Sequence, residues 1–322
     1  SDSDWPTFRR NTGREGSATT SLGPNIRQSW TQDLGGRLTQ PIVADGRLYV
    51  CSREKRTLYA LNASTGDILW TFSTPAEIDS SPTYFQGMLL FGCRNGWVYN
   101  LSAADGEQIW SFRAAPTERR IVSYGSVESS WPVIGSLLVL EEEDRTVVYA
   151  AAGRNSYLDG GIYLYGLDVV TGEIAYTQRI FNPAQDNEAR YEAHEIDGAQ
   201  PDVMVFDGTY ISMQSKVFDR ELNPVRTPAA PHIYASGGFL DDQAWHRNFW
   251  LYASGWTKMN KFINMFPNVG QLLVHEEDRI YGVKYFTQSQ GQSRVFYPEQ
   301  QGYYLFCDSD EDGTLDCNDG CP

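Results

Sequence analysis

The stretch LYALNASTGDILWTF, residues 58–72, returns about forty residues later as VYNLSAADGEQIWSF (98–112) and again as LYGLDVVTGEIAYTQ (164–178). Each copy has an aliphatic pair, a Thr-Gly or Asp-Gly turn and an aromatic residue four positions after the glycine. A glycine at such a turn permits the left-handed backbone conformation of a tight hairpin. The first copy therefore predicts two antiparallel strands, at 58–61 and 68–72.

A second strand pair precedes each of the first two copies, as QPIVADGRLYVCS (40–52) and SSPTYFQGMLLFGC (80–93). Four strands in about forty residues make one blade of a β-propeller. Such a sheet is apolar on both faces, so neighbouring blades must stack around an axis. We expect the recurring aromatic residue, which is Trp70, Trp110 or Tyr176, to wedge between blades.

The rest of the chain carries weaker copies of this pattern. PDVMVFDGTYISMQSKVFDREL (201–222) predicts a fourth unit, 238–256 begins a fifth, and 270–286 begins a sixth that ends near 302–307. RQSWTQDL (27–34) matches only a final strand, which we expect to complete the last blade and close the ring. The prediction is an all-β propeller of four-stranded blades over residues 1–306, with six blades favoured and seven possible.

Charge and hydropathy narrow the classes of partner. The chain has 41 acidic and 26 basic side chains, and its formal net charge of -15 disfavours nucleic acid. No apolar run is long enough for a membrane span. The sequence begins SDSDWPTF without Met or an apolar leader, so we expect any export signal to have been removed or not included.

Five cysteines favour an exported protein. Cys307, Cys317 and Cys321 fall within the last sixteen residues, which is typical of chains exported to an oxidising compartment. We therefore expect a secreted, cell-surface or periplasmic location. Cys51 and Cys93 take equivalent positions in successive repeats, either as small buried hydrophobic residues or as a disulfide.

The motif Ala60-x-Asn62-x-x-Thr65-Gly66-x-x-x-Trp70 resembles the repeat of the pyrroloquinoline-quinone-like propellers. These include quinoprotein alcohol dehydrogenases and an outer-membrane assembly lipoprotein. DWPTFRRN (4–11), ESSWPV (128–133) and GFLDDQAWHRNFW (238–250) are similar to an exported bacterial branch of this family. The resemblance implies a propeller, generally of eight blades. Its dehydrogenases use an adjacent Cys-Cys pair and an axial calcium ion, and this sequence has no Cys-Cys pair, which disfavours quinone chemistry.

The segment CDSDEDGTLDCNDGCP (307–322) forms a separate predicted unit. Counted from Asp308, it places oxygen ligands at the spacing of a calcium loop, with Gly313 at the sharp turn. The predicted calcium ligands are Asp308, Asp310, Asp312, the Thr314 carbonyl, Asp316 and Asp319. A solvated acidic tail is the alternative. The segment resembles a thrombospondin type 3 repeat, which implies calcium as cofactor and Cys317 and Cys321 as half-cystines.

Two polar groups lie where propellers expose loops. The first comprises Arg119, Arg120, Glu128, Trp131, Arg154 and Tyr157, and the second comprises Asp241, Asp242, His246 and Arg247. Bidentate donors, carboxylates and flat rings together suit a glycan or peptide at the ring mouth. The alternative is that these groups only pair with one another.

The leading functional hypothesis is an exported, non-catalytic binding or scaffolding propeller with a calcium-stabilised tail. One alternative is a carbohydrate lyase or hydrolase using Asp241, His246 and Arg247. Another is a structural subunit of an extracellular assembly, in which copies of the chain or other modules are partners.

Overall fold

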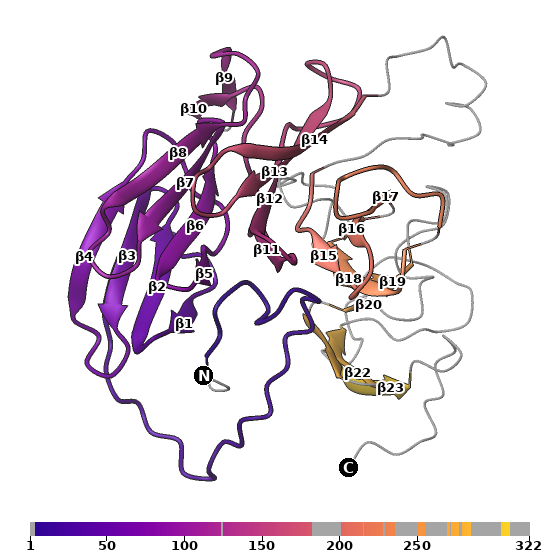
Figure 1. Ribbon diagram of the computed structural model, residues 1–322. Helices are drawn as coiled ribbons and strands as arrows, with labels where there is room; N and C mark the ends of the chain where they lie inside the picture. The colour runs from indigo at the N-terminus through magenta and orange to yellow at the C-terminus, as the bar shows by residue number, and fades with distance from the viewer. Residues whose placement is uncertain are drawn as a thin grey trace.

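The computed structural model describes residues 4–123, 125–181, 201–214, 216–227, 229–235, 250–254, 269–270, 272–276, 279–284 and 304–309. Every regular element in these residues is a β-strand, as predicted. They therefore contain no helix that could cross a membrane. The sheets fan out around the N-terminal segment in Figure 1 as a β-propeller.

Three four-stranded antiparallel sheets form the first three blades. The first blade contains β1 (Ile42–Ala44), β2 (Arg47–Ser52), β3 (Thr57–Asn62) and β4 (Ile68–Ser73). The second contains β5 (Thr83–Phe85), β6 (Met88–Cys93), β7 (Trp97–Ser102) and β8 (Gln108–Arg113). The third contains β11 (Leu138–Glu141), β12 (Thr146–Ala152), β13 (Ile162–Asp168) and β14 (Ile174–Ile180). Because β5 contacts both β1 and β11, the first strands of these three blades lie on the inside of the ring.

A two-stranded hairpin separates the second and third blades, with strands β9 (Arg120–Ser123) and β10 (Ser126–Ser129). The fourth blade is a three-stranded sheet. Its strands are β15 (Val205–Phe206), β16 (Ile211–Met213) and β17 (Lys216–Phe218).

The fifth blade combines two three-stranded sheets. One contains β18 (His232–Ala235), β19 (Trp250–Ala253) and β20 (Val269–Gly270), and the other contains β21 (Leu272–Glu276), β22 (Arg279–Lys284) and β23 (Tyr304–Ser309). A single residue separates β20 from β21, and one hydrophobic cluster joins Ile233 and Tyr252 to Leu273 and Ile280. The described residues therefore form five blades. The prediction of six or seven was wrong, because it counted these two sheets as separate units.

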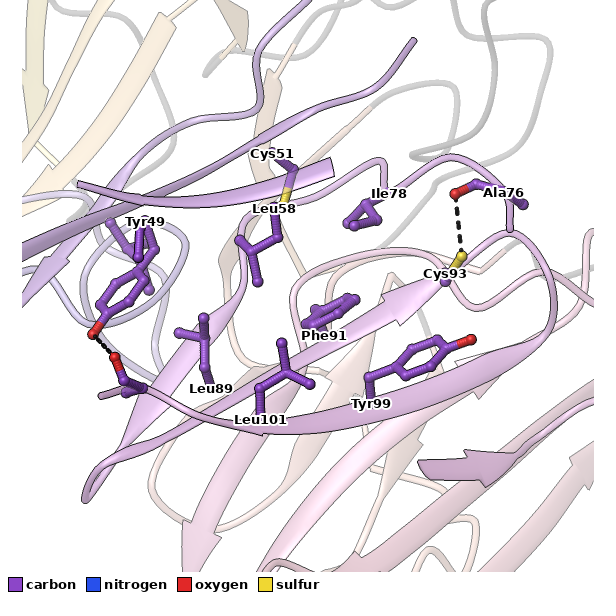
Figure 2. Close-up of a cluster of buried hydrophobic side chains, with 13 residues drawn as sticks. Tyr49, Cys51, Leu58, Ala76, Ile78, Leu89, Phe91, Cys93, Tyr99 and Leu101 are labelled. Atoms are coloured by element: carbon purple, nitrogen blue, oxygen red, sulfur yellow. Dashed lines mark hydrogen bonds between the residues drawn. The ribbon is translucent and has the colours of Figure 1, made fainter. Parts of the chain in front are cut away.

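The hydrophobic core lies between neighbouring blades, as the repeat predicted. In Figure 2, Tyr49 and Leu58 of the first blade face Leu89, Phe91 and Leu101 of the second. Comparable clusters lie between the second and third blades and between the third and fourth. Each fully buried large side chain stabilises the fold by about 1.5–3 kcal/mol, so these clusters hold the blades together.

The tryptophan of the repeat docks on the glycine of the next blade. Trp70 lies on Gly106 and Trp110 lies on Gly172. The indole N–H of each ring also donates a hydrogen bond to a carbonyl three residues before that glycine, that of Ala103 at 3.2 Å and that of Val169 at 3.0 Å. The predicted wedge is therefore confirmed for both tryptophans. Tyr176 also packs between blades, but its hydroxyl donates to Glu142 at 3.0 Å.

Residues 27–34 do not form the predicted closing strand. They have no strand pairing, and most of their side chains are exposed. Trp30 nevertheless docks on Gly66 of the first blade, and its indole N–H donates to the Ala63 carbonyl at 3.0 Å. Docking on Gly66 requires only the indole ring of Trp30 and its N–H group. Residues 27–34 can therefore supply the wedging tryptophan without forming the strand that was predicted.

Residues 5–16 fill the centre of the ring, and we refer to them as the axial segment. In Figure 1 they lie between the first blade and the sheet of β22 and β23. Backbone hydrogen bonds of 2.7–3.3 Å join Trp5 to Val43, Pro6 to Tyr84, Thr12 to Phe206 and Glu15 to His275. The axial segment therefore contacts the first, second, fourth and fifth blades.

Arg14 anchors the axial segment to the remaining blade. Its buried guanidinium donates to the carbonyls of Leu137 at 3.1 Å and Ser136 at 3.3 Å, directly before β11. It also donates to the Met204 carbonyl at 3.2 Å and the Thr7 hydroxyl at 2.6 Å. Burial lowers the pKa of Arg14 to about 9, which still leaves a cation at neutral pH. The oxygen acceptors offset the cost of burying that charge.

Candidate functional site

A ladder of alternating charges crosses one face of the first three blades. Its members, in order of contact, are Glu77, Arg53, Asp79, Arg94, Glu128 and Arg154. Arg53 lies 2.8 Å from Asp79, and Arg94 lies 2.5 Å from Asp79 and 2.9 Å from Glu128. The Glu128 carboxylate is fully buried and also pairs with Arg154.

The ladder fixes the hairpin of β9 and β10 against the propeller. Arg94 follows β6 in the second blade, Glu128 lies in β10, and Arg154 follows β12 in the third blade. A buried ion pair contributes little net stability, because desolvation offsets the Coulomb attraction, but removing one partner is costly. We therefore regard Glu128 as the residue that positions the hairpin.

A groove with a volume of about 590 Å³ lies between this hairpin and the second blade. We call it the arginine groove, because four of its lining residues are Arg56, Arg113, Arg119 and Arg120. Trp97 and Tyr99 supply aromatic surface, and Val127 of the hairpin supplies an aliphatic one. In a chain of net charge -15, this is a local concentration of positive charge.

The arginines of the groove differ in their partners. Arg119 pairs with Asp159 at 2.7 Å while its side chain stays 59% exposed. Arg113 lies 3.7 Å from the exposed Glu118. Arg120 is exposed and makes no ion pair with another described residue. The groove therefore presents guanidinium groups that remain accessible to a ligand.

The structure brings together most of the first predicted group. Arg119, Arg120 and Glu128 line the groove, and Arg154 joins it through the charge ladder. Trp131 is buried, and its indole N–H donates to the carbonyl of Asp159, the partner of Arg119, at 2.8 Å. Tyr157 lies in the β12–β13 loop, where its backbone N–H donates to the Asn155 side chain at 2.8 Å.

The other predicted site residues lie almost entirely outside the described residues. This holds for Asp241, Asp242, His246 and Arg247, and for the calcium ligands Asp310, Asp312, Thr314, Asp316 and Asp319. The backbone of Asp308 pairs with Ile280 in the β22–β23 ladder. Cys51 and Cys93 are buried free thiols, so they take the hydrophobic role rather than forming a disulfide.

Sequence reasoning missed Arg56, Arg113 and Trp97 as groove residues. Trp97 and Arg113 are directly opposite each other in the β7–β8 ladder, at the end of the blade that faces the groove. A β-bulge between Asn100 and Leu101 shifts the register by one residue, so the turn around Gly106 alone would not place Arg113 opposite Trp97. The repeat gave no indication that the hairpin would cover this end of the blade.

A second cavity of about 370 Å³ lies between the axial segment and the fourth and fifth blades. Glu15, Asp207, His232 and His275 line it. The His232 ring contacts the Ala230 carbonyl at 2.9 Å through Nδ1, and burial lowers the pKa of its imidazole. Within the described residues, no group of three or more His, Cys, Asp or Glu side chains is arranged to hold a metal ion.

The fold is that of a pyrroloquinoline-quinone-like β-propeller. Residues 8–188 match the family described as outer membrane protein assembly factor BamB, and they make up more than half of the chain. The chain therefore belongs to this family.

Individual relatives match shorter parts of the chain. An outer membrane protein assembly factor BamB of Nitrosomonas eutropha is 22% identical over 157 residues, which is 49% of this chain and 33% of that protein. A quinone alcohol dehydrogenase subunit of Gluconacetobacter polyoxogenes is 27% identical over 111 residues, which is 30% of this chain and 15% of that protein. The chain thus spans a third or less of these relatives.

A solved structure supports the fold. The crystal structure of quinohemoprotein alcohol dehydrogenase from Comamonas testosteroni superposes with a TM-score of 0.52 at 13% identity, over 80% of this chain and 48% of that one. At this identity the likeness concerns the fold alone.

The residues on the axis do not fit a quinone cofactor. The inside of the ring holds the axial segment, and Arg14 makes hydrogen bonds there to the third and fourth blades. The sequence has no adjacent cysteine pair. A quinone at this position would have to displace a buried cation from several oxygen acceptors, which is unfavourable.

Proposed function

We propose that the chain is an exported, non-catalytic β-propeller that binds another protein at the arginine groove. The observation that carries this proposal is the filled axis. Because the axial segment occupies the centre of the ring, binding is left to the outer faces, where the arginine groove of about 590 Å³ presents accessible charge.

Family membership supports the same proposal. The family and one relative are named as assembly factors for outer membrane proteins, a role that requires export and contact with other proteins. For this chain we accordingly infer a secreted, cell-surface or periplasmic location and a protein partner. The strong net negative charge is consistent with a soluble surface that does not bind nucleic acid.

We also propose that residues 307–322 bind calcium through Asp308, Asp310, Asp312, Thr314, Asp316 and Asp319. The support is the spacing of oxygen ligands in the sequence. Adding calcium to the chelator-treated chain should raise its melting temperature, and the double variant Asp310→Asn/Asp312→Asn should abolish the increase. An identical melting temperature with and without calcium would exclude this site.

Photo-crosslinking in cells that express the chain tests the proposed binding. A photoreactive amino acid at Val122, on the hairpin, should give one discrete protein adduct that mass spectrometry identifies. Val122 pairs across the hairpin with Val127, which lines the groove. Leu22 is the control, because its exposed fraction of 78% matches the 75% of Val122 but it lies outside the hairpin and the groove. Equal labelling from both positions, or no protein adduct from Val122, would overturn the proposal.

A further inference from the structure

We infer that the arginine groove takes an extended, acidic segment of the partner protein, in which carboxylate side chains alternate with apolar ones. This inference rests on the proposed function and specifies the chemistry of the partner.

The charge of the groove favours carboxylates. Its lining has four arginines and two glutamates, and one of these glutamates, Glu128, is already neutralised by Arg94 and Arg154. The whole chain is negative, but physiological salt screens the interactions of exposed charges over a Debye length of about 8 Å. A ligand in the groove therefore experiences mainly the nearby arginines.

The chemistry of arginine adds selectivity for carboxylates. A guanidinium offers five N–H donors in a planar fork that matches the two oxygens of a carboxylate. Arg119 uses Nη1 for its contact with Asp159, and Arg120 makes no ion pair with a described residue. Both side chains therefore have donors left for an incoming carboxylate.

The positions of the arginines favour an extended ligand over a single small anion. Arg56 comes from the first blade, Arg113 from the end of β8 in the second blade, and Arg120 from β9 in the hairpin. Three separate elements thus supply positive charge along one groove. A strand-like segment presents successive side chains at intervals of about 3.3 Å and can meet them in turn.

Apolar surface lies beside the charge. Trp97 and Val127 line the groove, and Val127 pairs across the hairpin with Val122. Both valines are exposed, so the hairpin presents a pair of aliphatic side chains to solvent. Alternate apolar side chains of the partner would cover part of this surface, while the acidic ones meet the arginines.

Fluorescence anisotropy on the full chain tests this inference. The probe is a fluorescein-labelled peptide in which glutamate alternates with leucine and serine, and the control peptide has glutamine at every glutamate. We expect the glutamate peptide to bind, with an affinity that falls as salt increases. The glutamine peptide should bind at least about tenfold more weakly.

Two charge-matched variants locate the site. Arg119→Glu/Arg120→Glu should weaken binding about tenfold or more, whereas Arg27→Glu/Arg226→Glu should leave it unchanged. The control arginines are exposed, lie outside the groove and undergo the same change in charge. Arg120→Gln provides a milder variant, which removes one accessible charge without breaking an ion pair, and it should weaken binding about threefold.

The outcomes separate this inference from the proposed function. The inference of an acidic ligand would be overturned if the two charge-matched variants bound the glutamate peptide with equal affinity. It would also be overturned if the glutamine peptide bound as tightly as the glutamate peptide. Tighter binding of an oligogalacturonate than of the peptide would also overturn it, in favour of an acidic glycan. If Val122 still crosslinks a protein in those cases, the proposed function stands with a partner of different chemistry.

Discussion

The indole ring of Trp70 lies against the backbone of Gly106, across the boundary between the first and second blades. Gly106 has a φ of +78°, and a Cβ atom there would be 2.6 Å from Cε3 of Trp70. The turn and the ring are therefore two halves of one contact, which explains why the glycine and the aromatic residue recur together in the sequence.

Gly106→Ala should destabilise the chain more than Gly87→Ala. Both glycines have positive φ, at +78° and +82°, so alanine is strained by about 1–2 kcal/mol in either position. Only Gly106 faces a ring, since no atom lies within 4 Å of a Cβ at Gly87. We expect Gly106→Ala to cost about 2 kcal/mol more in urea unfolding. Equal losses would mean that Trp70 does not dock on this turn.

Arg14→Met should lower the free energy of unfolding by about 3 kcal/mol or more. The substitution leaves the buried carbonyls of Ser136 and Met204 without the Arg14 donor, while the Leu137 carbonyl keeps only the Thr83 hydroxyl. Arg10→Met is the matched control in the same segment, because Arg10 is only partly buried and donates to the Ser17 carbonyl at 3.3 Å. It should cost about 1 kcal/mol. Similar losses for the two variants would contradict the role of Arg14.

Glu128→Gln should destabilise the hairpin of β9 and β10. The neutral side chain keeps its shape but leaves Arg94 and Arg154 with less compensation for their charge, which costs about 3 kcal/mol. Glu54→Gln removes the carboxylate from an exposed pair with Arg37 at 2.6 Å, and its effect should be much smaller and should fade in salt. Denaturant titration measures the loss in free energy of unfolding for both variants. A larger loss for Glu54→Gln than for Glu128→Gln would contradict the role of the buried ladder.

Stability should fall at alkaline pH because of Cys93. Burial raises the pKa of its thiol to about 11, so the unfolded chain loses this proton near pH 9 while the folded chain keeps it. The free energy of unfolding should therefore decrease from pH 9 to pH 11, by about 2–3 kcal/mol from this group. Burial also raises the pKa of the Cys51 thiol, which adds a decrease of its own over the same pH range, so Cys93→Ala should make the decrease shallower without removing it. If the free energy of unfolding of Cys93→Ala had the same pH dependence as that of the natural chain, the decrease would have to come from other groups, such as Tyr49.

The sequence predicts the first three blades well because each repeats the same local chemistry. The expected strands at 58–61 and 68–72 correspond to β3 and β4, and the wedge of Trp70 and Trp110 is confirmed. Turn glycines and alternating apolar residues are short-range signals. They decide strand pairing within a blade and the burial of its two faces.

The axial segment and the groove depend on contacts between residues far apart in sequence. The segment around Arg14 has no periodic pattern, and a sequence gives no reason to bury an arginine among carbonyls of the third and fourth blades. The arginine groove likewise joins Arg56 to Arg120 across two blades and a hairpin. Only the spatial arrangement of the blades shows that Arg119 and Arg120 lie beside Trp97.

Hydrogen exchange of the axial segment tests the central claim most directly, which is that the chain fills its own axis. The amides of Trp5, Arg14 and Gly16 donate hydrogen bonds inside the ring, so residues 5–16 should exchange as slowly as β6. The exposed residues 18–29 serve as an internal reference and should exchange rapidly. If residues 5–16 exchanged as fast as this reference, the axis would be open, and the account of a plugged binding propeller would be wrong.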